Sequence, residues 1–562
     1  MNKMKKSLML SKYKIKQIIP LLVAALLLTA TSCSSDFLKE YSQDLSRVKT
    51  VTDLNELLMG DCLMPLGEAG VKYSTYYIHN TNYAVLHFMG DELQENISTS
   101  GKPDILDEAS TYFPYFCWQR DTWVDFESKS TLSSNEAQYW DLAYEKIDRC
   151  NMVIDAEKDV ACDNDEDRAL LRHVMGECHY LRATYYFTLV NLYAKPYVPS
   201  TAESTPGVPV KTSSKVEDKE YTRASVAEVY RQILADLDAA ETDLKDVKSP
   251  ATIYHVGIDA VYIFRSRVEM FMQEWQKAAD DAKRALDEDS YLQNLVGWTD
   301  GYPISSDNKE VVYSNGSSCF GNIVFMAPGK KNNYGTVYSP AFEVSDHLVS
   351  LFAKDDGRRT AYITNQDDVN YHRWSYHKIN NSTKHYNIYN TASDVFCIRT
   401  AEAYLNLAEA DAELGKDAEA CQYLTRLRKA RVASNAAVSL SGEALVKFIR
   451  EERERELCFE GHRWFDLRRY MVDTKYPQTT TIVHTMSAYH MVNYHDVRQY
   501  TNYYRLEPND DAYTLNIPKD VRDFQPSIGS NTRPDRPYFR QEIASNDDNG
   551  DSGDDGEGGD GE

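Results

Sequence analysis

The chain has 562 residues and a formal net charge of −24 at neutral pH. This length allows one large domain or several smaller ones. So acidic a chain is unsuited to nucleic acid, because affinity for nucleic acid comes from Lys and Arg side chains that displace counterions from phosphates. An uncharged ligand is the simplest expectation, although a local cluster of arginines could still bind an anion.

Residues 1–32 have the three parts of a secretory signal peptide. Six lysines and no acidic residue stand at the start, an apolar segment runs from Ile18 to Leu28, and small residues lead to Cys33. The apolar segment is shorter than the roughly 20 residues that span a bilayer. A cysteine at this point is typical of a lipoprotein signal, although Ala30 stands where leucine is more usual. We therefore expect cleavage before Cys33 and lipid on its side chain; an ordinary signal peptide is the alternative.

The mature chain is expected to begin with an anchor and to end with a tail. Two or more acyl chains on Cys33 would hold the protein stably at a membrane, where one chain would not. Residues 33–60 look polar and extended, which suits a spacer. The C-terminal segment 541–562 carries eight acidic residues and no basic one from Asn546 onward, which predicts disorder. Its aspartate spacing does not fit an EF-hand calcium loop.

Three helical pairs are expected within residues 61–540, which we interpret as one mainly α-helical domain. Apolar residues recur at spacings of three and four, and breaks rich in Asp, Asn or Gly separate the helices of a pair. The second pair also begins with a capping box, formed by Ser225 and Glu228. The pairs lie near residues 140–193, 225–286 and 398–433.

Two of these pairs share a spacing that is typical of tetratricopeptide repeats. In the third pair the bulky Tyr404 is followed by the small residues Ala408 and Ala420, and the second pair repeats this spacing from Tyr262. Small residues let two helices approach closely, so that stacked pairs bury each other's apolar faces. Unrelated amphipathic helices are the alternative.

Two long segments outside the pairs, 67–134 and 291–395, are rich in aromatic and small polar residues and show little periodicity. Loops of this length in a compact protein tend to be functional. An aromatic ring can stack on the C–H face of a sugar, whose hydroxyls need fixed polar partners. We predict a ligand-binding platform that consists of Trp118 and Trp298, with Tyr302 and Trp123 next. For each of these rings, burial in the core is the alternative.

No catalytic, metal or cofactor motif stands out. The chain has no GxSxG, HExxH, P-loop or CxxC pattern, so we expect no metal and no cofactor. The histidine pairs His372/His377 and His484/His490 lack a third ligand at a recognisable spacing.

Glu456 and Glu460 are four residues apart and resemble the paired carboxylates of a glycosidase. Such a pair must flank its substrate, whereas these two side chains would lie side by side on one helix. Nearby arginines would keep both carboxylates ionised. We therefore predict a structural ion-pair network here, made with Arg453, Arg455, Arg463 and Arg468.

Six segments match a known family in order. RERELCFEGHRWFDLRRY (Arg453–Tyr470) is similar to R-x2-E-L-x-F-E-G-x-R-W-x-D-L-x-R, and the segment that starts GECHYLRA at Gly176 is similar to G-E-A-x-F-L-R-A, with Cys178 in place of Ala. On these motifs the chain resembles the SusD/RagB family of outer-membrane lipoproteins from Bacteroidetes, over nearly the whole mature length. The other four matching segments are Trp140–Ile154, Ser225–Ala240, Ile398–Gly415 and Tyr513–Ile528.

The resemblance implies a fold and a function that spacing alone does not. In the family, tetratricopeptide units pack against a loop-rich second part whose aromatic residues contact the ligand. Its members are lipid-anchored at the cell surface, where they cover a SusC-like TonB-dependent transporter and pass an oligosaccharide to it. We therefore expect an outer-membrane lipoprotein that binds glycan without cleaving it. A peptide-binding protein of the RagB branch, a glycoside hydrolase dependent on Glu460, and a scaffold that binds only protein are the alternatives.

Overall fold

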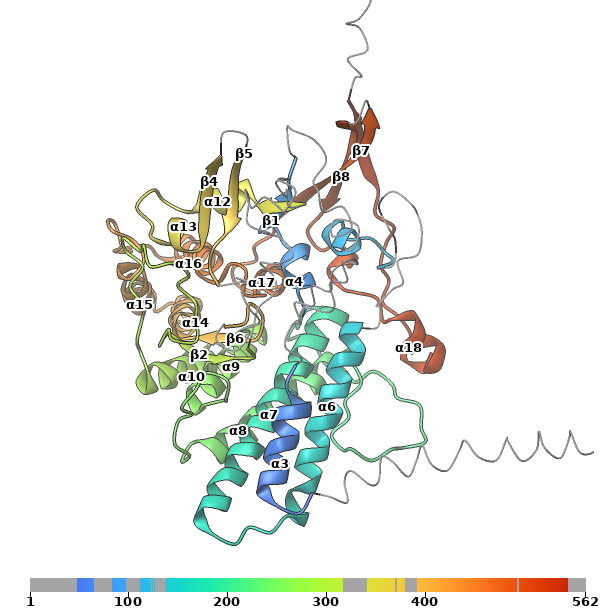
Figure 1. Ribbon diagram of the computed structural model, residues 1–562, viewed down its shortest axis with the longest axis vertical. Helices are drawn as coiled ribbons and strands as arrows, with labels where there is room; N and C mark the ends of the chain where they lie inside the picture. The colour runs from blue at the N-terminus through green and yellow to red at the C-terminus, as the bar shows by residue number, and fades with distance from the viewer. Residues whose placement is uncertain are drawn as a thin grey trace, which may run out of the picture.

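The computed structural model describes residues 48–64, 83–97, 112–122, 124, 126, 138–316, 341–368, 371–379, 392–492 and 495–543. The predicted signal peptide, Cys33 and the acidic tail from Asn546 onward lie outside these residues. Residues 541–542, predicted as the start of the tail, belong instead to the strand β9 (Tyr538–Glu542). The fold is mainly α-helical, as predicted, with long helices in the lower part of Figure 1 and short sheets in the upper part. In the described part of the chain, no helix combines the length and apolarity needed to cross a bilayer.

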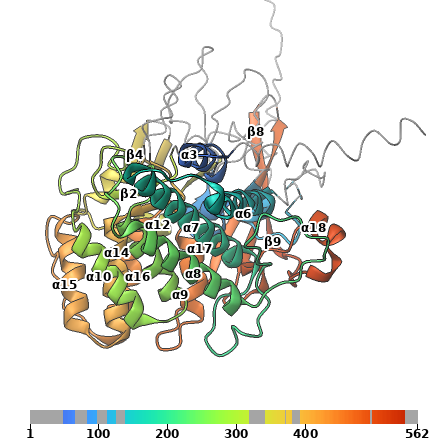
Figure 2. The same cartoon turned by 90° about the horizontal axis from the view of Figure 1, so that it is seen from below.

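The first predicted pair corresponds to α6 (Gln138–Ala156) and α7 (Asp165–Tyr193), which pack against each other. Asn164 caps α7 by accepting a hydrogen bond from the backbone N–H of Asp167. From Val174 onward every residue of α7 except His179 is buried, because α3 (Val51–Leu57), α6 and α8 (Val226–Leu244) pack against it (Figure 2). The capping box predicted at Ser225 and Glu228 is present at the start of α8.

The second predicted pair, near residues 225–286, contains three helices, so the prediction of two helices was wrong. The chain turns after α9 (Ile258–Phe271), where Gln273 has a φ of 62°, and returns as α10 (Trp275–Glu288). The repeat spacing therefore describes α9 with α10, and α14 (Thr400–Glu413) with α15 (Asp417–Lys429). Buried alanines of α10 let it pack against both α9 and α14, an arrangement that fits tetratricopeptide pairing.

Most of the remaining elements are short, apart from α16, β7 and β8, and they include several antiparallel sheets that the sequence patterns did not indicate. The sheets pair β1 (Leu93–Glu95) with β3 (Phe342–Val344), β2 (Val311–Ser314) with β6 (Cys397–Arg399), β4 (Ile363–Asp368) with β5 (Tyr371–Tyr376), and β8 (His495–Leu506) with both β7 (Ile482–Val492) and β9 (Tyr538–Glu542). The other helices are η1 (Leu58–Cys62), α4 (Val85–Met89), η2 (Glu157–Asp159), α12 (Asp346–Leu351), α13 (Arg358–Ala361), α16 (Gly442–Leu457), α17 (Arg463–Met471), η4 (Asp511–Tyr513), α18 (Lys519–Phe524) and η5 (Pro526–Ile528).

A buried network of arginines and glutamates connects these elements, and Glu456 at the end of α16 is its centre. Its carboxylate accepts hydrogen bonds from Arg358 at 3.0 Å, Arg399 at 2.9 Å and Arg431 at 2.8 and 2.9 Å. Burial alone would raise the pKa of Glu456, but the charges of Arg431 and Arg399 outweigh burial and hold the pKa well below its usual range. Glu456 therefore stays ionised inside the core.

The predicted ion-pair network is confirmed, but the four arginines predicted as partners of Glu456 and Glu460 were wrong. The arginines that contact Glu456 and Glu460 come from distant segments, whereas the four nearby arginines bond elsewhere. Arg453 pairs with Asp466, Arg455 with Glu452, and Arg463 with Asp91 and Glu454, while Arg468 donates to the Ala194 carbonyl. Glu460 also lies beyond the end of α16, where Phe459 has a φ of 59°.

Replacing Glu456 with glutamine should lower the free energy of unfolding by about 3–5 kcal/mol, because three buried guanidinium groups lose their shared counter-charge. Urea denaturation followed by circular dichroism and fluorescence together measures this change. The stability that Glu456 contributes is present above the ordinary glutamate pKa of 4.5 and is lost as pH falls through its lower folded value. The difference between wild type and E456Q should therefore shrink below about pH 4.

Glu451→Gln is the matched control, because Glu451 is half-buried on the same helix. Its effect should stay within about 0.5 kcal/mol. Equal effects of the two substitutions would contradict a central role for Glu456.

Candidate functional site

The segment that carries Trp298 and Tyr302 is held at its base by the buried network. The Gln293 N–H donates to Glu310 at 2.7 Å, and Arg431 donates to the Gln293 carbonyl at 2.5 Å. Glu310 in turn accepts from Arg431 and Arg399, the same arginines that contact Glu456. The loop therefore leaves the core from a fixed point.

A close backbone contact adds to this anchoring. The Leu295 N–H donates to the Ala430 carbonyl at 2.8 Å, and the Leu295 carbonyl lies against Gly357. A Cβ atom at Gly357 would lie 1.8 Å from the Leu295 carbonyl oxygen, so only glycine fits at this position.

Trp298 is half-buried in a turn between two glycines. Gly297 and Gly301 have φ values of 69° and 84°, which other residues rarely adopt. The indole N–H donates to the Gly301 carbonyl at 2.7 Å. This hydrogen bond fixes the ring orientation, while part of the indole remains at the surface.

Tyr302 follows at the surface and stacks on His377. The two ring centroids are 4.5 Å apart and the planes are inclined by 25°. Tyr302 keeps 38% of its surface exposed. Burial lowers the pKa of His377, so its imidazole is neutral at physiological pH and supports the tyrosine as an uncharged ring.

His377 is also tied to the buried network, through the next residue. Lys378 is wholly buried and donates to the carbonyls of Glu456 at 2.7 Å and Cys458 at 2.9 Å. The Ile304 N–H donates to the Lys378 carbonyl at 3.1 Å, which joins the two segments. Both rings of the stack are therefore positioned by the same buried charges.

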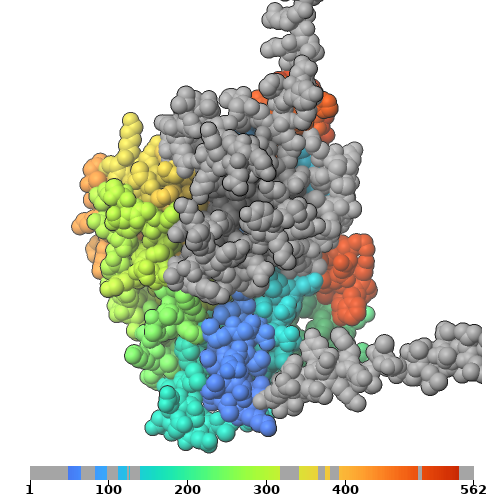
Figure 3. Space-filling view, in the orientation of Figure 1, coloured from blue at the N-terminus to red at the C-terminus, as the bar shows by residue number. Residues whose placement is uncertain are grey.

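Exposed polar side chains lie on the same loop. Thr299 and Asp300 separate Trp298 from Tyr302, and Asp307 follows; all three are exposed. We call residues 295–308 together with His377 the aromatic surface. In the space-filling view, the yellow-green atoms around residue 300 form part of the molecular surface beside the yellow atoms that follow them in the sequence (Figure 3). Exposed rings next to hydroxyl and carboxylate groups are suited to a polar ligand that has apolar faces.

Trp118, predicted as a main part of the platform, lies in the core instead. Its ring is fully buried, stacks on His484 with centroids 4.5 Å apart, and donates its N–H to the Met89 carbonyl at 2.9 Å. A ring without an exposed face cannot stack on a ligand, so the structure favours the core alternative for Trp118. Trp123 lies outside the described residues.

Sequence reasoning missed the role of His377, which was considered only as a metal ligand. It also missed Trp374, whose ring is covered by the Arg359 guanidinium at 4.6 Å. No periodicity links Tyr302 to His377, because the two residues come from different segments that meet only in the folded chain.

Other places in the described part of the chain suit a sugar less well. A cavity of about 40 Å³ lies in the core among Tyr180, Phe187, Phe264 and Tyr313, and it has room for only a few water molecules. Glu456 and Glu460 are both buried and bonded to basic side chains, so neither carboxylate faces a substrate.

Comparison with known proteins identifies the same family over two parts of the chain. The family model described as "SusD family" matches residues 325–548. A second model, described as "Starch-binding associating with outer membrane", matches residues 81–270.

Individual relatives agree with these matches. "SusD-like protein P38" of Formosa agariphila is 26% identical over 395 residues, which are 60% of this chain and 73% of that protein. A solved SusD-like carbohydrate-binding protein from Bacteroides vulgatus has a TM-score of 0.62 at 19% identity and covers 86% of this chain and 98% of its own. "Surface glycan-binding protein A" from Bacteroides uniformis has a TM-score of 0.56 at 16% identity, with coverages of 86% and 99%. With both parts of the sequence and the fold in agreement, the chain belongs to the SusD family.

Proposed function

We propose that this protein is a non-catalytic surface lipoprotein that binds oligosaccharide at the aromatic surface and passes it to a SusC-like TonB-dependent transporter. The single observation that carries the proposal is the stack of Tyr302 on His377, beside Trp298, on a loop anchored in the buried core. Membership of the SusD family supports the ligand class, since similar proteins are named as carbohydrate- or glycan-binding.

The physical basis is a match between fixed rings and the C–H faces of a sugar. Stacking removes apolar area on both partners from water, which contributes about 25 cal/mol per Å². Because His377 and the Gly301 carbonyl already hold the two rings, binding loses little side-chain entropy at Tyr302 and Trp298. Thr299 and Asp300 supply acceptors and a donor for sugar hydroxyls.

The proposed location follows from the start of the sequence and from the family. Lipid on Cys33 would hold the protein at the outer membrane. The prediction of an extended spacer over residues 33–60 was wrong for residues 51–60, which lie in α3 and η1 and pack against α6 and α7. Only the residues between Cys33 and Thr50 would act as a spacer. The description "associating with outer membrane" of the second family model supports this placement.

Tyr302→Ala and Trp298→Ala should each weaken oligosaccharide binding roughly 5- to 30-fold, which corresponds to about 1–2 kcal/mol of lost stacking. Affinity electrophoresis against a panel of polysaccharides identifies the ligand, and calorimetry then measures Kd for each variant. The polysaccharide should be retained without being shortened.

Phe524→Ala is the control, because Phe524 is an 82% exposed aromatic on α18, far from the aromatic surface in Figure 1. It should bind like wild type. Unchanged affinity of both loop variants, or cleavage of the polysaccharide, would refute the proposal, and peptide found in mass spectra of the purified protein would favour the peptide-binding alternative.

Cys33→Ser should release the protein from the membrane fraction, because a serine cannot receive the thioether-linked lipid. Cell fractionation and mass spectrometry of the N-terminus test this outcome, with Cys162→Ser as a control that should remain at the membrane. A wild-type protein that keeps residues 1–32, or a C33S variant that stays in the membrane fraction, would contradict lipid anchoring.

A further inference from the structure

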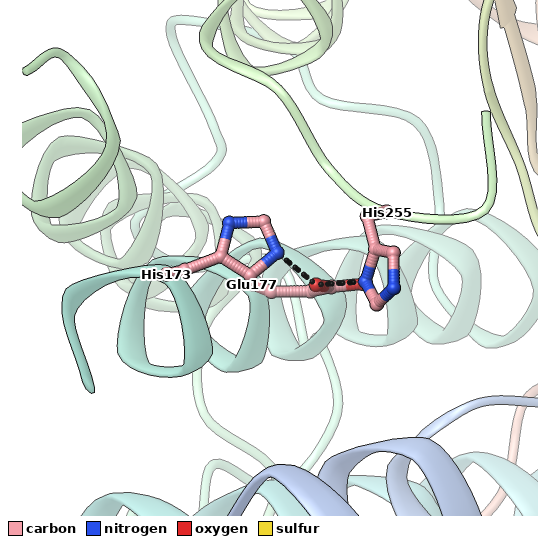
Figure 4. Close-up of side chains that lie close together, drawn as sticks. All are labelled: His173, Glu177 and His255. Carbon is pink, nitrogen blue, oxygen red and sulfur yellow. Dashed lines mark hydrogen bonds and ion pairs between the residues drawn. The ribbon is translucent and has the colours of Figure 1, made fainter. Parts of the chain in front are cut away.

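Two histidines and a glutamate that are not part of the aromatic surface meet on one side of α7. His173 and Glu177 lie one turn apart on α7, and His255 reaches them from the loop before α9 (Figure 4). Glu177 Oε2 lies 3.1 Å from His173 Nε2 and 3.1 Å from His255 Nδ1. The three ligand atoms all lie within 4.8 Å of one another.

These distances are close to those around a bound metal ion. Zinc binds histidine nitrogen and carboxylate oxygen at about 2.0–2.2 Å, which places two ligands of a tetrahedron ~3.3 Å apart. Two of the three separations already match this value, and small side-chain rotations would bring the third into range. The same distances also fit two ordinary hydrogen bonds between the histidines and Glu177. The burial and the charged neighbours of Glu177 distinguish these hydrogen bonds from a metal site.

The surroundings of Glu177 favour a cation. Its carboxylate is fully buried, and in the described part of the chain it contacts two imidazoles and no arginine or lysine. Its second oxygen, Oε1, is buried without any hydrogen-bond partner. A buried carboxylate with one free oxygen is costly unless a positive charge compensates it.

A second cluster of similar composition differs because an arginine pairs with its carboxylates. Asp91, His347 and Glu454 also bring three ligand atoms together. There, however, Arg463 pairs with Asp91 at 2.6 Å and with Glu454 at 2.9 Å. The guanidinium already supplies the positive charge and would repel a metal ion. Among the described residues, no arginine or lysine pairs with Glu177.

Access from solvent is also present. The side chains of His173 and His255 are 15% and 30% exposed, whereas Glu177 is closed off. An ion could therefore enter from the histidine side and keep a water molecule as its fourth ligand. Two imidazoles and one carboxylate form a ligand set that suits zinc and neighbouring divalent transition metals, and suits calcium or magnesium poorly.

We propose that His173, Glu177 and His255 form a binding site for a divalent transition-metal ion. The ion would tie α7, the central buried helix, to the loop that connects α8 with α9. That loop already contacts β2 through the hydrogen bond from the Ser314 N–H to the Ile253 carbonyl at 2.7 Å. Metal binding would stabilise the folded chain at this junction, independently of any glycan.

The test uses the purified protein, free of a histidine tag and stripped with chelator, with zinc chloride as the probe. Calorimetry should show one equivalent of zinc bound with micromolar or tighter Kd, and zinc should raise the melting temperature. His173→Ala and His255→Ala should each weaken zinc binding by at least roughly tenfold. Loss of a residue that only hydrogen-bonds to a metal ligand already lowers metal affinity roughly 10- to 100-fold, and loss of the ligand itself should cost more. Cobalt(II) should give a visible absorption band that both variants lose.

His179→Ala is the matched control. His179 lies on the same helix and contacts a carboxylate, Asp236, but Arg182 also pairs with that carboxylate. This variant should bind zinc like wild type. Circular dichroism checks that the variants fold. Because the two histidines come from separate segments, a folding defect in one variant still leaves the other as a test. Absence of stoichiometric binding to wild type, or unchanged binding by His173→Ala and His255→Ala, would overturn the proposal.

Discussion

The structure depends on a carboxylate that is kept ionised in the buried interior. Glu456 has no exposed surface, yet three guanidinium groups and the Tyr362 hydroxyl bond to it. Desolvating so many charges is expensive, and the interaction energy offsets that cost only when nearly every donor and acceptor is satisfied. The contacts must therefore all form together, which ties distant segments of the chain into one arrangement.

This arrangement positions the aromatic surface. The loop of Trp298 and Tyr302 starts at Gln293, which bonds to Glu310 and Arg431, and the partner His377 precedes Lys378, which bonds to the end of α16. Two segments that present rings at the surface are thus held by one set of buried charges. A loop anchored in this way can keep its rings in place without a regular secondary structure of its own. That rigidity favours a ligand that gains by stacking, because little entropy remains to be lost on binding.

The helical part follows a different physical rule. Helices α6 to α10, α14 and α15 bury their apolar faces against one another. Small residues such as Ala278 and Ala420 let neighbouring helices approach closely. α14 and the C-terminal part of α7 are exceptions, since nearly all of their residues are buried and they bring polar side chains inside. Glu177 is one of them, and its charge has to be balanced by neighbours that reach α7 from other segments. The proposed metal site and the Glu456 network are thus two solutions to the same problem of a buried negative charge.

The sequence by itself determined the location of the three helical regions, the capping box at Ser225 and the family, because these depend on local spacing along the chain. It also indicated that Trp298 and Tyr302 belong to a functional loop, a prediction that remains open. Only the tertiary structure decided which arginines surround Glu456, that Trp118 is buried, that the chain turns at Gln273, and that Tyr302 stacks on His377. Those outcomes depend on contacts between residues far apart in the chain, and side-chain burial and charge pairing at such distances leave no periodic pattern in the sequence.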